Sequence, residues 1–221
     1  MGKTKPINRR VFCQFLIGLL FAPRLYAGQH QLSQSAQGRK RIIHKKPSDI
    51  LVLYYSLSGK TEIMAEAIAT RYRADLIQIG AQEYSNDFIG SIRAGIDAWT
   101  EESHTTIDPA IINLSRYQFI FLGSPIWWYR PAVPLWAFTA KNNFQSQNII
   151  LFNTFNSRFK DKYIHEFSDL IKSKGGNLDD HIFIRRGRWY NQLNQNELID
   201  EIQTLIKSKE SRWAFKRTSQ N

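Results

Sequence analysis

The chain of 221 residues contains a single cysteine, Cys13, and only five histidines. One cysteine excludes an intrachain disulfide and a thiolate metal cluster. The histidines show no metal-ligand spacing, so we expect no metal site. The sequence also lacks a G-x-S-x-G motif, which argues against a serine hydrolase. Metal, thiol and serine chemistry are therefore not expected.

A long hydrophobic run is also missing. The most apolar stretch, residues 11–22, is about 12 residues long, whereas a membrane span needs roughly 20. Basic residues precede this stretch, no acid occurs before it, and residues 25–27 (Leu-Tyr-Ala) offer a cleavage site. This pattern predicts a signal peptide over residues 1–27. Arg9 and Arg10 resemble the twin-arginine export motif, with a general secretory signal as the main alternative. We therefore expect export to the bacterial periplasm or cell surface.

Acidic residues are scarce, with 19 against 30 lysines and arginines, giving a formal net charge of +11. Cleavage after Ala27 would remove five basic residues and no acid. The exported chain would then keep 25 basic and 19 acidic residues, a net charge of +6. It would also lose Cys13, so no thiol would be open to oxidation outside the cell.

The rest of the chain divides by composition. Residues 28–48 are polar and predict a disordered linker. Residues 49–206 are long enough for one domain with a core. Residues 207–221 form a basic tail around Trp213 and Phe215. We expect a frayed terminus there, with weak contact to an anionic membrane surface as the alternative.

The most informative stretch of the domain begins with an apolar run, Ile50 to Tyr55, which predicts a strand. A short polar loop and a helical pattern follow it. A glycine in such a loop allows close backbone approach, and the helix start supplies unpaired N–H groups and partial positive charge, so the loop predicts a phosphate site. The candidate residues are Ser56, Leu57, Ser58, Gly59, Lys60 and Thr61. Their end matches a nucleotide P-loop, but Tyr54 stands where that motif needs glycine. An ordinary strand-to-helix turn is the other alternative.

A second buried strand, Phe119 to Leu122, ends at Gly-Ser-Pro. Three aromatic residues follow directly, Trp127, Trp128 and Tyr129. Neighbouring side chains diverge in either regular structure, so the three cannot all point into one core. Some of them must line a surface or a pocket.

Strand and helix patterns alternate along the rest of the domain. Further strands are predicted at residues 75–79, 148–153 and 181–184. Helices are predicted at 63–68, 87–100, 163–171 and 194–206, with one more opened by Pro131 and Pro134. Five strands alternating with helices predict an α/β fold with a doubly wound parallel sheet.

The two loops together resemble those of the flavodoxin family, and most closely its branch with a Gly-Ser-Pro-Ile-Trp-Trp loop. The resemblance covers residues 49–206. It implies a five-stranded sheet of order 2-1-3-4-5 with FMN bound at the carboxyl ends of the strands. It places the flavin phosphate on the first loop and the ring on Trp127. The ring-binding candidates implied by the resemblance are Pro125, Ile126, Trp127, Trp128, Thr154, Phe155 and Asn156.

One departure concerns the loop after the fourth strand, which commonly carries glycine in flavodoxins. Here Thr154 is followed by Phe155 and Asn156, so Phe155 either stacks on the flavin or fills the core. A run of arginines after the fifth strand, residues 185–188, has no role that we can assign from the sequence.

The resemblance implies an electron-transfer protein with no catalytic side chain. One alternative is an FMN-dependent quinone or nitro reductase using NAD(P)H, and another is a flavin-free binding module. Flavodoxins are usually acidic, whereas this chain is basic, so we expect an acidic redox partner. We expect no nucleic-acid partner.

Overall fold

Five parallel strands form the centre of the computed structural model, which describes residues 40–44, 47–81, 105–187, 191–209 and 211–213. They are β2 (Ile50–Tyr55), β3 (Asp75–Ala81), β5 (Phe119–Trp127), β7 (Asn148–Phe155) and β8 (Asn177–Arg185). Their order is β3-β2-β5-β7-β8, which is 2-1-3-4-5 when these five are counted along the chain. This sheet confirms the predicted α/β class.

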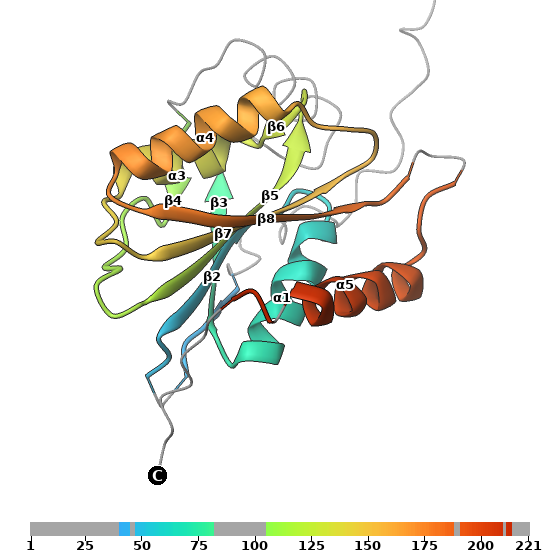
Figure 1. Cartoon of the computed structure of the whole chain (residues 1–221), viewed down its shortest axis with the longest axis horizontal. Coiled ribbons are helices and arrows are strands. Elements are labelled where there is room, and N and C mark those ends of the chain that lie inside the picture. The colour runs from blue at the N-terminus through green and yellow to red at the C-terminus, as the bar shows by residue number, and fades with distance from the viewer. Residues whose placement is uncertain (1–39, 45–46, 82–104, 188–190, 210, 214–221) are drawn as a thin grey trace, which may run out of the picture. The chain divides into compact units, whose positions relative to one another are not determined.

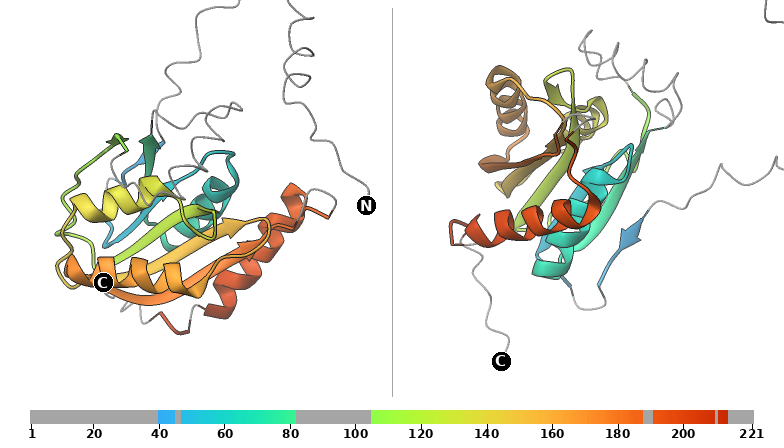
Figure 2. Two further views of the ribbon diagram at one scale, coloured as in Figure 1. Left: turned by 90° about the horizontal axis from the view of Figure 1, so that it is seen from above. Right: turned by 90° about the vertical axis from the view of Figure 1, so that its right-hand side faces the viewer.

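Helices cover both faces of the sheet. On one face lie α3 (Val133–Lys141) and α4 (Asp161–Ser173), and on the other α1 (Lys60–Tyr72) and α5 (Gln195–Lys209) (Figure 1). The further views show the same separation of the two helix pairs (Figure 2). No helix in the described part of the chain is long and apolar enough to cross a membrane. The helix predicted at residues 87–100 lies outside the described residues.

The start of α5 shows how local sequence sets a helix boundary. The Asn194 side-chain oxygen accepts hydrogen bonds from the N–H groups of Asn196 and Glu197, and the Glu197 carboxylate accepts one from Asn194 N–H at 2.8 Å. This reciprocal arrangement is a capping box, as predicted from the spacing. It fixes where the chain turns back after β8.

Three short strands extend the sheet at its margins. They are β1 (Arg41–Ile42), β4 (Ile107–Asp108) and β6 (Arg130–Pro131). Strand β4 pairs with β3, and β6 pairs with β5, both antiparallel. The prediction that Pro131 opens a helix is wrong, because Pro131 lies in β6, where it pairs with Ile126 of β5. Of the two prolines, only Pro134 lies in the first turn of α3.

Strand β1 corrects the predicted linker. It pairs antiparallel with β3, so the predicted disordered segment 28–48 is wrong at residues 40–44. Lys40 also pairs with Glu62 and Glu66 on α1, and the Asp75 carboxylate accepts a hydrogen bond from His44 N–H at 3.0 Å. Backbone pairing and ion pairs hold this segment, and neither leaves an apolar pattern in the sequence.

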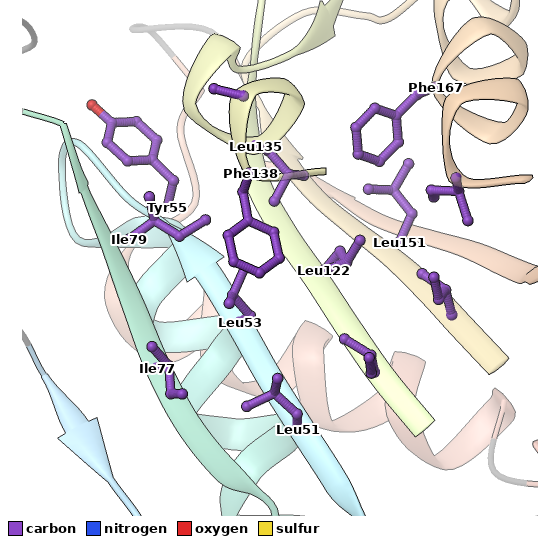
Figure 3. Packing of buried hydrophobic residues seen from close by; sticks show 14 of the residues in the cluster. Leu51, Leu53, Tyr55, Ile77, Ile79, Leu122, Leu135, Phe138, Leu151 and Phe167 are labelled. Atoms are coloured by element: carbon purple, nitrogen blue, oxygen red, sulfur yellow. The ribbon is translucent and has the colours of Figure 1, made fainter. Parts of the chain in front are cut away.

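The core has two layers because β2, β3, β5 and β7 bury side chains on both faces. Between the sheet and α3 and α4 lie Leu51 and Leu53 from β2, Leu122 from β5, Phe138 from α3 and Phe167 from α4 (Figure 3). The opposite layer packs the other side chains of the strands against α1 and α5. Burial on both sides is typical of parallel sheets and explains the continuous apolar runs.

Trp213 corrects the predicted C-terminal tail. Its side chain is buried, with its ring centroid 5.4 Å from that of Phe121 and 6.1 Å from that of Tyr72. Its indole N–H donates to the Asp180 carboxylate at 3.1 Å. The expectation of a frayed tail is therefore wrong at residues 207–209 and 211–213. One aromatic residue proposed for membrane contact belongs to the core instead.

Candidate functional site

The first loop, residues 56–59, leads from the carboxyl end of β2 into α1 and turns at Gly59. Gly59 has φ +75°, and nothing lies within 4 Å of the position that a Cβ would occupy. The first bond of the helix joins Ile63 N–H to the Gly59 carbonyl at 3.1 Å. The N–H groups of Lys60 and Thr61 precede this bond, in the part of a helix that lacks internal partners. This open glycine turn at a helix start suits an anion.

A hairpin forms the second part of the site. Strands β5 and β6 are joined by two residues, Trp128 and Tyr129, whose φ angles are +46° and +73°. Positive φ at both positions is typical of a type I′ turn, which usually takes asparagine or glycine. Bulky residues rarely adopt this conformation. The turn exposes 58% of Trp128, while Trp127 stays half-buried with its ring edge-on to Tyr55 at 5.4 Å.

Arg130 anchors the hairpin to the helices. It follows the turn directly and is 7% exposed. Its guanidinium lies 4.5 Å from the Trp136 ring centroid and 5.2 Å from that of Tyr163. Cation–π contacts with two helices hold β6 against the fold. These contacts therefore fix the strand that follows Trp128 in the hairpin.

The third loop follows β7, whose end is tied to the start of α1 by two buried threonines. Thr61 Oγ1 and Thr154 Oγ1 lie 2.8 Å apart and form a hydrogen bond. The donation from Thr61 to phosphate suggested by the sequence stays a prediction, because either hydroxyl can be the donor in the bond to Thr154. Phe155 is also buried, and its ring packs against Phe159 and Phe183. It fills space between strands while also lining the site.

Hydrogen bonds among polar side chains of the sheet, the buried Ser124 and Asn153 and the half-buried His181, support the hairpin. The Asn153 amide donates to the Ser124 carbonyl at 2.8 Å, and its oxygen lies 2.9 Å from His181 Nε2. The Ser124 hydroxyl in turn accepts from Ala132 N–H at 3.1 Å. Burial lowers the pKa of His181 to about 4, against raising effects of Asp180 and Asp161. His181 is therefore neutral at pH 7.

These loops enclose a cavity of about 350 Å³ at the carboxyl ends of the strands. This volume is at the lower end of the range of roughly 300–1,000 Å³ for small-molecule sites. The predicted residues that line it are Leu57, Ser58, Pro125, Ile126, Trp127, Trp128, Thr154, Phe155 and Asn156. The predicted residues Ser56, Gly59, Lys60 and Thr61 belong to the adjoining turn and helix start. The structure thus brings all three loops to one place.

Four further residues line the cavity and were not predicted as site residues. They are Tyr129, Ser157, Arg158 and Arg186. Arg186 bonds the Asn156 side-chain oxygen through Nη2 at 2.7 Å and Nε at 3.2 Å, and burial lowers its pKa. The sequence signal for Arg186 was the run of arginines at the end of a strand. No group of three or more histidine, cysteine or acidic side chains that could hold a metal occurs in the described segments.

A sequence model of the flavodoxin family matches residues 49–182. The chain belongs to the flavodoxin family. No curated protein sequence is similar enough to match it. The family assignment agrees with the resemblance carried by the first two loops.

Two solved structures show the same fold. One is a flavoprotein from Lactobacillus acidophilus in complex with FMN, with 24% identity and a TM-score of 0.51, covering 61% of this chain and 91% of that one. The other is a protein from Bacteroides uniformis assigned to the flavoproteins, with 18% identity and a TM-score of 0.53. The match covers 70% of this chain and 97% of the Bacteroides uniformis protein. The described flavodoxin domain therefore spans nearly the whole length of both proteins.

Proposed function

We propose that the chain binds FMN non-covalently in the site cavity and passes electrons to or from a redox partner. The observation that carries this proposal is the meeting of three loops around one cavity with aromatic walls and a helix start beside it. The flavodoxin family and the FMN complex of a relative support the choice of ligand. Bound FMN supplies the redox chemistry, so no catalytic side chain is required.

The residues present fit FMN at both ends. The open turn at Gly59 and the N–H groups of the helix start would hold the phosphate. Trp127 and Trp128 would hold the ring, and Thr154 to Asn156 would complete the wall of the cavity. Arg186 places a positive charge in this wall, and that charge stabilises negative charge on a bound ligand.

We expect the purified protein to be yellow, and we expect a Gly59→Ala variant to lose affinity for FMN selectively. An added methyl group meets no protein atom within 4 Å, but alanine is strained at φ +75°, so the variant should displace the turn that presents N–H groups to the phosphate. Lost charge-assisted hydrogen bonds of about 1.5–3 kcal/mol weaken FMN binding by about ten- to a hundredfold. Titrations of FMN, FAD and riboflavin into both proteins check this.

Riboflavin is the matched control, because it has the same ring and no phosphate. Its affinity should be nearly equal for the wild-type protein and Gly59→Ala. Equal weakening of both ligands would mean that the phosphate does not lie at this turn. A colourless protein that also fails to take up FMN would contradict the proposed function and favour a flavin-free binding module.

We also propose that the protein is exported by the twin-arginine route to the periplasm or cell surface. Arg9 and Arg10, the short apolar stretch and the cleavage site after Ala27 support this. On this route the protein would bind its flavin in the cytoplasm and then be exported in the folded state.

Replacing Arg9 and Arg10 together by lysine should leave the uncleaved precursor in the cytoplasm. The change keeps both charges and removes the guanidinium geometry. Cell fractionation with detection of precursor and mature chain measures the result. Normal processing and export of this variant would assign the chain to the general secretory route, with flavin acquired outside.

A further inference from the structure

Two basic side chains, Arg158 and Arg186, line the site cavity, and a third, Lys160, lies against Tyr129 in its wall. Arg158 and Lys160 lie over the Tyr129 ring, with Cζ at 5.3 Å and Nζ at 4.9 Å from its centroid. Arg186 is held by the Asn156 side chain. We call Arg158, Lys160 and Arg186 the basic rim. Within the described residues none of the three forms an ion pair, and no acidic side chain lines the cavity.

The basic rim adjoins an exposed tryptophan that the fold holds in a fixed place. Trp128 is 58% exposed at the tip of the hairpin, in a backbone conformation unusual for its size. The neighbouring Tyr129 carbonyl accepts a hydrogen bond from Lys160 N–H at 3.0 Å. Two of the three rim residues, Arg158 and Lys160, are therefore in direct contact with the hairpin. Exposed tryptophan, tyrosine and arginine held in place are typical of the residues that dominate protein interfaces.

We propose that the basic rim and Trp128 form the docking surface for an acidic redox partner protein. The proposal rests on the proposed function only in that electrons enter or leave through the adjacent cavity. Unpaired positive charge attracts and orients an acidic surface, and Trp128 supplies the apolar contact at its centre. Docking there brings the partner next to the cavity wall.

A protein surface fits these residues better than a membrane surface does. The Arg186 guanidinium is half-buried and its orientation is fixed by Asn156, as suits recognition of individual carboxylates. Membrane contact through an interfacial segment needs a larger apolar face. Among the described side chains of the basic rim and the hairpin, Trp128 alone offers a large exposed aromatic surface.

The first experiment measures binding without reference to the flavin. A peptide of eight glutamates is titrated into the protein as purified, and the indole N–H signal of Trp128 is followed by NMR, assigned with Trp128→Phe. The test variant is Arg158→Gln/Lys160→Gln. The control is Lys172→Gln/Lys207→Gln, which removes two exposed charges near the ends of α4 and α5. Both variants have the same net charge.

At low ionic strength the test variant should bind the peptide about tenfold more weakly than the wild-type protein, and the control should change by less than about twofold. Equal weakening in both variants would show that binding follows net charge, which overturns the proposal. An unmoved Trp128 signal would overturn it as well. Binding to phosphatidylglycerol vesicles without binding to the peptide would assign the surface to a membrane.

The second experiment tests electron transfer with small oxidants of opposite charge. Reduced, FMN-loaded protein is mixed with hexacyanoferrate(III) or with hexaammineruthenium(III). Each ion accepts one electron, two ions are consumed per flavin, and the flavin protons pass to solvent. The test variant should be oxidised about three- to tenfold more slowly by the anion and faster by the cation, while the control stays near wild type.

The two experiments separate the two proposals. Protein that binds no FMN cannot be used for the second experiment, and this failure belongs to the proposed function. The peptide titration still decides the docking surface in that case. FMN-loaded protein whose oxidation rates do not depend on the basic rim would overturn the docking proposal alone.

Discussion

Replacing Gly123 by alanine should lower the free energy of unfolding by about 3 kcal/mol, the upper end of the usual range for overpacked cores. Gly123 lies in β5 between Tyr54 of β2 and Phe152 of β7, and both of these neighbours are fully buried. A Cβ at this position would lie 1.9 Å from the Phe152 ring. The ring cannot move without displacing its own neighbours, because parallel sheets are packed on both faces. Urea unfolding without added flavin measures the loss.

A double variant tests the stated cause. Phe152→Leu removes most of the ring that the new methyl group would meet. Gly123→Ala should therefore cost much less in the Phe152→Leu protein than in the wild-type protein, and the difference is the coupling of a double-mutant cycle. An equal cost in both proteins would mean that the clash with Phe152 is not the reason. The result also concerns the site, because Gly123 directly precedes Ser124 and Pro125.

Acid should weaken the fold through His181. Burial lowers the pKa of this imidazole to about 4 in the folded protein, against an ordinary value of 6.5. Because the folded pKa is the lower one, the stabilising contribution is complete above pH 6.5 and is lost as the pH falls from 6.5 to 4. The expected loss is about 3 kcal/mol at pH 4.

The comparison for this prediction is His181→Gln, which does not titrate and keeps a hydrogen-bonding group near Asn153. The difference in free energy of unfolding between wild-type protein and variant is measured by urea unfolding at pH values from 7 to 4, with flavin equally absent from both. It should change by about 3 kcal/mol across this interval. A difference that stays constant with pH would show that His181 does not titrate in this window.

The sequence predicted the fold well wherever burial leaves a strong pattern. The run Ile50 to Tyr55 and the run Asn148 to Asn153 are buried on both faces of a parallel sheet, so they are apolar almost throughout. Strand β8 was predicted too short, at residues 181–184. Its exposed and half-buried first residues, including Asp179, have the composition of a loop.

The parts of the site that the sequence missed depend on long-range contacts. The hairpin turn at Trp128 and Tyr129 lacks the glycine or asparagine that normally identifies such a turn. Arg186 reaches the cavity because it meets Asn156, 30 positions away in the chain. Thr61 was predicted as a loop residue, but its bond to Thr154 depends on α1 lying against the end of β7, 93 positions away in the chain.

Strand β1 has a consequence for self-association. Exposed edges of a sheet can pair with the edges of other molecules, and proteins limit this hazard by covering or shortening them. The two residues of β1 cover β3, so the long free edge among the described strands is that of β8. Two copies of the domain can pair through their β8 edges. Such a pair is related by twofold symmetry and is closed, because it uses both long edges. Growth of a continuous β-sheet fibre would need a second long edge, and on the opposite side of the sheet β1 offers only two residues.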